Sequence, residues 1–210
     1  MRETLRRWPA AACARLLRLN VIARMEQRDG LARLADDLEW RRALEASHAG
    51  RRVLIATNTG GHFAIETIDR MLGAALTLRG AAVTHVLCDA ALPACQMCEF
   101  NLTPDVSALA RSGPDPLLCG YCHPPAEARL QALGLDVRRL GASLSDADRA
   151  EASALAQGAS RSDLDRLSWR GVPVGMHALA GALRFFARSD LEDEPHGEAM
   201  LRRYVQASAL

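Results

Sequence analysis

The chain has 210 residues, of which 49% are apolar, and its 26 basic and 25 acidic side chains leave a net charge of +1. This composition excludes an intrinsically disordered chain, because the apolar content is high enough for a core and the net charge is low. The balance of charge also predicts no overall attraction to nucleic acid, so we expect no nucleic-acid partner.

Arginine is concentrated near the amino terminus, where residues 1–24 contain six arginines and a single acid, Glu3. Arg15 and Arg18 interrupt the apolar stretch before it reaches the length of a signal-peptide core. No stretch reaches 18 apolar residues. We therefore predict a cytoplasmic protein. A helix packed on the domain or on a partner is the interpretation we favour for this segment, and peripheral contact with the inner membrane is the alternative.

Residues 3–48 have a helical composition that is interrupted at Pro9 and at Asp29–Gly30. Gly50 follows as a typical helix-terminating residue. The sequence thus predicts an N-terminal helical extension over residues 1–50.

A strand–helix–strand unit follows. The apolar run 53–56 predicts a buried strand, residues 58–61 a turn, and residues 83–87 a second strand parallel to the first. Between them the spacing of apolar residues predicts an amphipathic helix that turns its polar residues Glu66, Asp69 and Arg70 to solvent. Its inward stripe would consist of Ile65, Ile68, Met71, Leu72, Ala75, Leu76 and Leu78.

The same alternation continues. A short helix with Pro124 and Pro125 near its start, ended by Gly134, precedes a third strand at 136–139. Ser145 and Asp148 have the spacing of a capping box and predict the start of another helix. We therefore predict an α/β fold with a Rossmann-like open parallel sheet over residues 51–160.

Residues 161–210 are predicted to form a C-terminal helical segment, in which GVPVGMHALAGALRFF is an apolar helix rich in small residues. We expect its Gly175, Ala178, Gly181 and Ala182 to permit close helix packing. A lone histidine on such a helix is usually a core residue, which is our expectation for His177. Arg184 is a candidate phosphate contact.

Five of the six cysteines lie within 35 residues, and four of them form two Cys-x-x-Cys pairs with 20 residues between the pairs. Two such pairs supply four thiolates for a tetrahedral Zn²⁺ ion, and a reducing cytoplasm favours metal ligands over disulfides. We predict structural zinc that stabilises a Cys-rich insertion, residues 88–123. Its ligands would be Cys95, Cys98, Cys119 and Cys122.

Other interpretations of these cysteines stay open. An iron–sulfur cluster is the first alternative, and redox-active or unliganded thiols are the second. Cys88 and His123 flank the two pairs and are able to replace one of the four ligands. A catalytic zinc ion would need an open coordination position and a nearby acid such as Asp89 or Glu99, whereas four thiols favour a closed site.

The sequence TNTGGH, residues 57–62, stands where α/β folds place their ligands, after a strand and before a helix. Gly60 and Gly61 let the backbone approach a ligand, and the N–H groups at the helix start suit a phosphate. Two glycines also occur in ordinary tight turns, which is the structural alternative. His62 is either an acid–base residue or a helix cap, and Glu66 lies one helical turn later.

The stretch TNTGGHFAIETIDRMLGAAL resembles the Gly-Gly-His turn that opens the acceptor-side domain of GT-B glycosyltransferases. The cysteine block beginning LCDAALPAC, the second cysteine pair, the segment GVPVGMHALAGALRFFARSDL and the ending RRYVQASAL resemble bacterial glycosyltransferase-like proteins of surface and capsular polysaccharide clusters. This resemblance covers roughly residues 51–210. The glycine turn is a common motif, and the cysteine block is the more specific one.

The resemblance implies the acceptor-side domain of a glycosyltransferase of surface-polysaccharide biosynthesis, with a sugar or lipid-linked sugar acceptor and a separate donor-domain partner chain. It implies His62 as general base, with Glu66 beside it. The acceptor would be bound by Asn58, Thr59, Gly60, Gly61 and Arg184. A non-catalytic zinc-stabilised scaffold and an iron–sulfur redox protein are the alternative functions.

Overall fold

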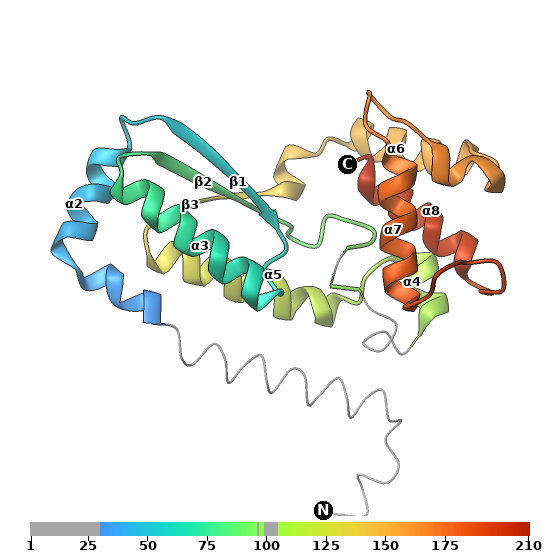
Figure 1. Cartoon of the computed structure of the whole chain (residues 1–210), viewed down its shortest axis with the longest axis horizontal. Coiled ribbons are helices and arrows are strands. Elements are labelled where there is room, and N and C mark those ends of the chain that lie inside the picture. The colour runs from blue at the N-terminus through green and yellow to red at the C-terminus, as the bar shows by residue number, and fades with distance from the viewer. Residues whose placement is uncertain (1–29, 96, 99–104) are drawn as a thin grey trace, which may run out of the picture. The chain divides into compact units, whose positions relative to one another are not determined.

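A computed structural model of the chain describes residues 30–95, 97–98 and 105–210 (Figure 1). The predicted helices before residue 29 and the candidate acid Glu99 lie outside these residues. The described chain forms two compact units. We call residues 30–91 with 117–143 the sheet unit, and residues 92–116 with 144–210 the helical unit. The predicted domain boundaries at residues 50 and 160 fall inside these units.

The sheet unit contains a parallel sheet of three strands in the order β1-β2-β3, formed by β1 (Arg52–Asn58), β2 (Ala82–Leu87) and β3 (Asp136–Arg139). Val53 pairs with Val83, and His85 pairs with Val137. The predicted α/β class is confirmed as a small open parallel sheet with helices. The helical elements of this unit are η2 (Gly30–Asp36), α2 (Leu38–Ser47), α3 (Phe63–Leu78), α5 (Pro116–Ala132) and η4 (Leu140–Ser143).

The core of the sheet unit joins side chains from α2, α3 and α5 to Leu87 of β2. Trp40 of α2 is 1% exposed and donates its indole N–H to the Leu133 carbonyl oxygen at 3.0 Å. Helix α2 begins where Asp37 accepts hydrogen bonds from two backbone N–H groups, so this acid separates α2 from the 3₁₀ turn before it. Leu54, between two inward-facing residues of β1, is 64% exposed on the opposite face of the sheet.

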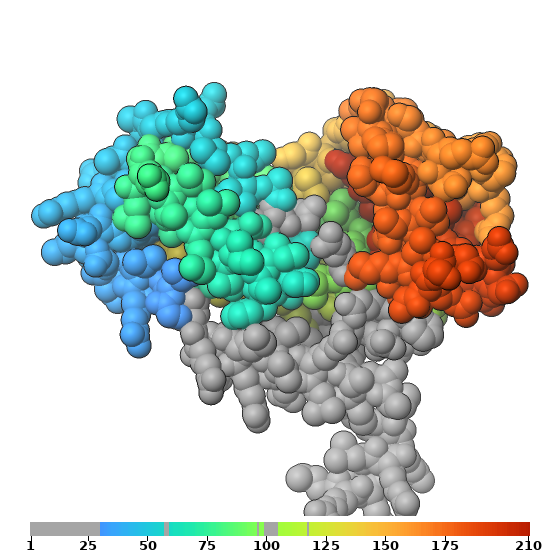
Figure 2. All heavy atoms as spheres, in the orientation of Figure 1, coloured from blue at the N-terminus to red at the C-terminus, as the bar shows by residue number. Residues whose placement is uncertain are grey.

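The predicted orientation of helix α3 is wrong. Its apolar stripe faces outward, with Ile68 63% and Met71 53% exposed, whereas the residues expected in solvent, Glu66 and Arg70, are only 2% and 1% exposed. The outward side of α3 is visible in Figure 2, in turquoise. An apolar face with one-turn spacing does not by itself say which side of a helix meets the sheet.

Small residues explain the orientation that α3 adopts. Its buried side includes Gly73, Ala74 and Thr77. A Cβ atom at Gly73 would lie 2.4 Å from Nε2 of His85 in β2, so only glycine permits this approach of helix and strand. The leucine and isoleucine side chains on the opposite side of α3 would hold the helix further from the sheet.

The helical unit consists of α4 (Val106–Ser112), α6 (Asp146–Gly158), η5 (Arg161–Arg166), α7 (Val174–Phe186) and α8 (Gly197–Ser208). The predicted capping box at Ser145 and Asp148 is confirmed. The small residues of α7 permit close packing, as predicted. A Cβ atom at Gly181 would lie 2.5 Å from the ring of Tyr204 in α8, and Ala178 and Ala182 are fully buried.

Three further predictions, on the Cys-rich insertion, the two prolines and His177, are wrong. The Cys-rich insertion is not one long loop, since it contains α4 and the first turns of α5, and Pro124 and Pro125 lie inside α5 rather than at its start. His177 is exposed, not part of the core, because the buried side of α7 passes through Val174, Ala178 and Phe185. Within the part of the chain described, no helix combines the length and the apolar content needed to cross a membrane.

Candidate functional site at the carboxyl edge of the sheet

The carboxyl ends of the three parallel strands lie at one edge of the sheet unit, which is where open α/β folds bind their ligands. The chain leaves β1 into the glycine turn, leaves β2 into Cys88 and Asp89, and leaves β3 into η4. The chain therefore gathers here several of the residues singled out from the sequence.

The two glycines of the turn pack against helix α5. A Cβ atom at Gly60 would lie 2.5 Å from Cβ of Ala126 and 2.7 Å from the carbonyl oxygen of Cys122. The backbone N–H of Gly61 donates to Sγ of Cys122 at 3.0 Å. Close contact with α5 thus gives Gly60 a structural role apart from any ligand, while Gly61 contributes its backbone N–H to this contact. Asn58 ends β1, where the pairing register with β2 shifts, and its side chain lies outside the described part; Thr59 is buried.

His62 is exposed and caps helix α3. Its Nδ1 accepts the backbone N–H of Ile65 at 3.4 Å. In a neutral imidazole that accepts at Nδ1, the proton is on Nε2. The capping histidine is therefore a hydrogen-bond donor at Nε2, which suits a phosphate or a developing oxyanion better than proton abstraction.

Glu66 belongs to a buried ionic cluster with two arginines. Its Oε1 lies 3.1 Å from Nε of Arg70 and 3.4 Å from Nε of Arg129 on α5. Glu66 and Arg70 are both almost fully buried. Glu66 thus contacts cations on both α3 and α5. Arg129 lies 63 residues away in the sequence, so local spacing could not indicate this pairing.

A second polar cluster lies at the ends of β2 and β3. Glu127 of α5 accepts two hydrogen bonds from the guanidinium of Arg139, both at 3.0 Å, and its Oε2 lies 3.4 Å from Nε2 of His123. Asp89 accepts the backbone N–H of Gly141 at 2.7 Å. Glu127 and Arg139 were not predicted from the sequence as site residues. The available signal was the position of Arg139 at the carboxyl end of a predicted strand, where open α/β folds bind their ligands.

Electrostatics keep Glu127 ionised. The hydrogen bond from Arg139 is the main cause that lowers the pKa of Glu127, and the Glu127 carboxylate in turn raises the pKa of Arg139. Glu127 is thus a carboxylate that holds the ring of His123 from one side. A histidine next to a carboxylate is the arrangement of an oriented acid–base residue.

The Cys95–Cys98 turn belongs to the helical unit, and both helices α7 and α8 hold its backbone. Arg184 donates to the carbonyl oxygens of Cys95 at 3.2 Å and Cys98 at 3.0 Å, and the Tyr204 hydroxyl donates to that of Cys95 at 3.1 Å. Arg184, a predicted acceptor-binding residue, therefore positions this turn. Burial raises the pKa of Tyr204 well above its usual value.

The sulfur of Cys95 has the surroundings of a thiolate. It lies 3.8 Å from Sγ of Cys98, which is 1% exposed. The hydrogen bond with Cys98, together with backbone N–H groups of Met97 and Cys98, lowers the pKa of Cys95 to about 7 although burial opposes this. A thiol with a lowered pKa forms the thiolate more readily, and the thiolate is the form that binds a metal ion or acts as a nucleophile.

Among the residues that the structure describes, no three His, Cys, Asp or Glu side chains are gathered as ligands of an ion. Cys95 and Cys98 belong to the helical unit, and Cys119 and Cys122 on α5 belong to the sheet unit. Zinc on these four cysteines stays a prediction.

Comparisons with known proteins identified no relative of the chain. No protein-family model matches the chain, no curated protein matches it, and no solved structure matches it.

Proposed function

We propose that the sheet unit is the acceptor-binding domain of a GT-B-like glycosyltransferase that acts in surface-polysaccharide assembly. The observation that carries the proposal is the exposed His62 at the start of α3, on the carboxyl edge of a parallel sheet. A sugar acceptor that carries a phosphate would take the Nε2–H of His62 as a donor, and the positive end of the α3 dipole would favour its charge.

In this proposal the polar cluster at the ends of β2 and β3 supplies the proton chemistry. The acceptor hydroxyl gives its proton to His123, which the Glu127 carboxylate orients, and its oxygen forms a bond to the anomeric carbon of the donor sugar. The bond from that carbon to the donor phosphate breaks, and a nucleoside diphosphate leaves. A donor-side domain, on a partner chain, binds the nucleotide-sugar.

Binding of the acceptor is tested by titrating ¹⁵N-labelled full-length chain with glucose 1-phosphate and with inorganic phosphate. We expect the amide signals of residues 60–66 to shift, and His62→Ala to weaken binding about tenfold, which is the loss of one charge-assisted hydrogen bond. His48→Ala is the control, since His48 is an exposed histidine of the same unit. Shifts confined to other residues, or none at millimolar ligand, would rule out this site.

A second candidate function, a zinc-stabilised scaffold, is favoured by the hydrogen bonds that both cysteine pairs receive. The N–H of Gly61 points to Sγ of Cys122, and N–H groups of Met97 and Cys98 point to Sγ of Cys95. Backbone donors of this kind surround metal-bound thiolates. We therefore propose a structural zinc ion held by Cys95, Cys98, Cys119 and Cys122.

Metal content of the chain, purified without air, tests this second candidate. We expect one zinc ion per chain, lost in Cys95→Ser with Cys98→Ser and kept in the control Cys88→Ser. Iron and sulfide with visible absorbance would show an iron–sulfur cluster in place of zinc. A metal-free wild-type chain would exclude both the zinc ion and the cluster.

A further inference from the structure

The helical unit has a groove of about 670 Å³ with an apolar floor. The floor is formed by four leucines, Leu179 and Leu183 of α7, Leu191 of the following loop and Leu201 of α8. Leu179 and Leu183 are only partly buried although they pack against the core of this unit. A groove of this size and lining is typical of a binding site for an apolar ligand or an amphipathic helix.

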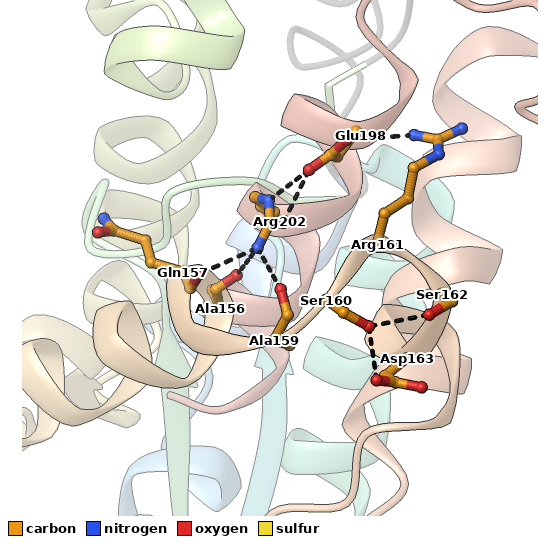
Figure 3. A network of polar contacts seen from close by, with 9 residues as sticks. All are labelled: Ala156, Gln157, Ala159, Ser160, Arg161, Ser162, Asp163, Glu198 and Arg202. Carbon is orange, nitrogen blue, oxygen red and sulfur yellow. Dashed lines mark hydrogen bonds and ion pairs between the residues drawn. The ribbon is translucent and has the colours of Figure 1, made fainter.

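The rim of the groove is acidic. Asp165, Asp190 and Glu192 line it together with one basic residue, Arg161. Figure 3 shows that Arg161 is directed to Glu198, at 3.6 Å. The charge of Arg161 is thus met by a carboxylate outside the rim, and the three rim acids give the groove a negative potential.

A second cation near the groove, Arg202, also has its partners outside the rim. Arg202 donates one nitrogen to the carbonyl oxygens of Ala156 and Ala159 at the end of α6, and the other to Glu198 at 2.7 Å (Figure 3). Among the rim acids, Asp190 accepts hydrogen bonds only from neutral donors in these contacts, the Ser189 hydroxyl and the backbone N–H of Glu192. The Asp165 carboxylate lies 3.8 Å from Nε of Arg166. A cationic ligand with apolar anchors would complement both rim and floor.

We propose that this groove binds the chain's own amino-terminal segment, residues 1–28. The segment contains the required chemistry, because Arg15 and Arg18 alternate with Leu16, Leu17 and Leu19. Residues 1–24 hold six arginines against one acid, which is opposite in sign to the rim. A helix over residues 15–25 would be about 16 Å long and would place leucines on the floor with arginines at the rim.

Photo-crosslinking of the full-length chain tests this directly. A photoreactive amino acid replaces Leu183 on the floor, and the product is digested and identified by mass spectrometry. The same amino acid at Ala154, an exposed residue of α6, is the control position. We expect crosslinks from position 183 to residues 1–28 and none from position 154. Mixing isotope-labelled and unlabelled chains separates products within one chain from products between two copies.

Charge variants give an independent readout. Asp190→Asn with Glu192→Gln should lower the crosslink yield about fivefold, and salt should lower it further, because rim contacts with arginine are electrostatic. The matched control, Asp146→Asn with Glu45→Gln, neutralises two exposed carboxylates that do not line the groove and should leave the yield unchanged. Crosslinks only between copies, crosslinks to other segments, or binding of the segment to anionic phosphatidylglycerol vesicles without any crosslink would each overturn the proposal.

Discussion

The backbone N–H of Gly61 donates a hydrogen bond to Sγ of Cys122, so the turn after β1 and helix α5 meet at a thiol. The residues that stood out separately in the sequence, a glycine pair and a cysteine pair, thus share one contact. Beside this hydrogen bond, position 60 needs glycine because a side chain there would meet α5. It also leads to the first prediction.

Gly60→Ala should destabilise the chain by about 1–3 kcal/mol, since the new methyl group would meet Ala126 and the carbonyl oxygen of Cys122. Gly120→Ala is the matched control on α5, where nothing lies within 4 Å of the added Cβ atom. That change should stabilise the chain by about 0.5–1 kcal/mol through helix propensity. Urea denaturation measures both; equal effects of the two variants would show that α5 does not pack on the turn.

Glu66→Gln should cost about 3–5 kcal/mol of unfolding free energy, because it leaves Arg70 and Arg129 without the carboxylate between them in a buried position. Glu45→Gln, which removes an exposed acid of α2, should change stability by less than about 0.5 kcal/mol. If Glu66→Gln is instead folded as well as wild type, the cluster is not buried as described, and a direct role of Glu66 at the acceptor would become the better interpretation.

Stability should fall in mild acid because of His85. Burial lowers the pKa of His85 to about 4, partly offset by the charge of Asp69. Below the ordinary histidine pKa of about 6.5 the unfolded chain binds a proton that the folded chain does not bind. This histidine alone should therefore cost about 2.5 kcal/mol between pH 7 and pH 4.5.

Urea denaturation at the two pH values checks this for wild type and His85→Gln. The variant should lose that part of the pH dependence, whereas His48→Gln, which changes an exposed histidine, should keep it. An identical pH dependence in wild type and His85→Gln would contradict the prediction.

The Cys95 thiol should react with iodoacetamide with a midpoint near pH 7 once a chelator has removed any bound metal, since its pKa is lowered to about 7. The hydrogen bond with Cys98 is the largest cause, so Cys98→Ala, which removes the donor, should move the midpoint upward. Peptide mass mapping of the alkylated Cys95 gives the rate at each pH. An unchanged midpoint in Cys98→Ala would show that Cys98 does not lower the pKa of Cys95.

The parts of the fold that depend on local signals were predictable. The three strands lie within two residues of their predicted bounds, and the Ser145 cap is where the spacing placed it. These features follow from apolar runs and from hydrogen bonds between residues close in the chain.

The misses have a common physical cause. The orientation of α3 depends on Gly73 meeting His85 and on Glu66 meeting Arg129, which are contacts between residues distant in the sequence. The early start of α5 ahead of two prolines, and the cluster of Glu127 with Arg139, likewise arise only when strands and helices come together. The candidate site was therefore predictable in its place, at the end of β1, but not in its complete set of side chains.

The division of the chain into two units bears on how the protein is made. Over residues 30–210, the chain passes between the units near residues 91, 116 and 143. During synthesis the sheet unit cannot acquire β3 until residues 92–116 of the helical unit have already left the ribosome, and those residues must then wait for α6, α7 and α8. Neither unit can be cut out as one continuous fragment. A nonsense mutation between residues 144 and 196 would remove α8, the helix against which α4 packs.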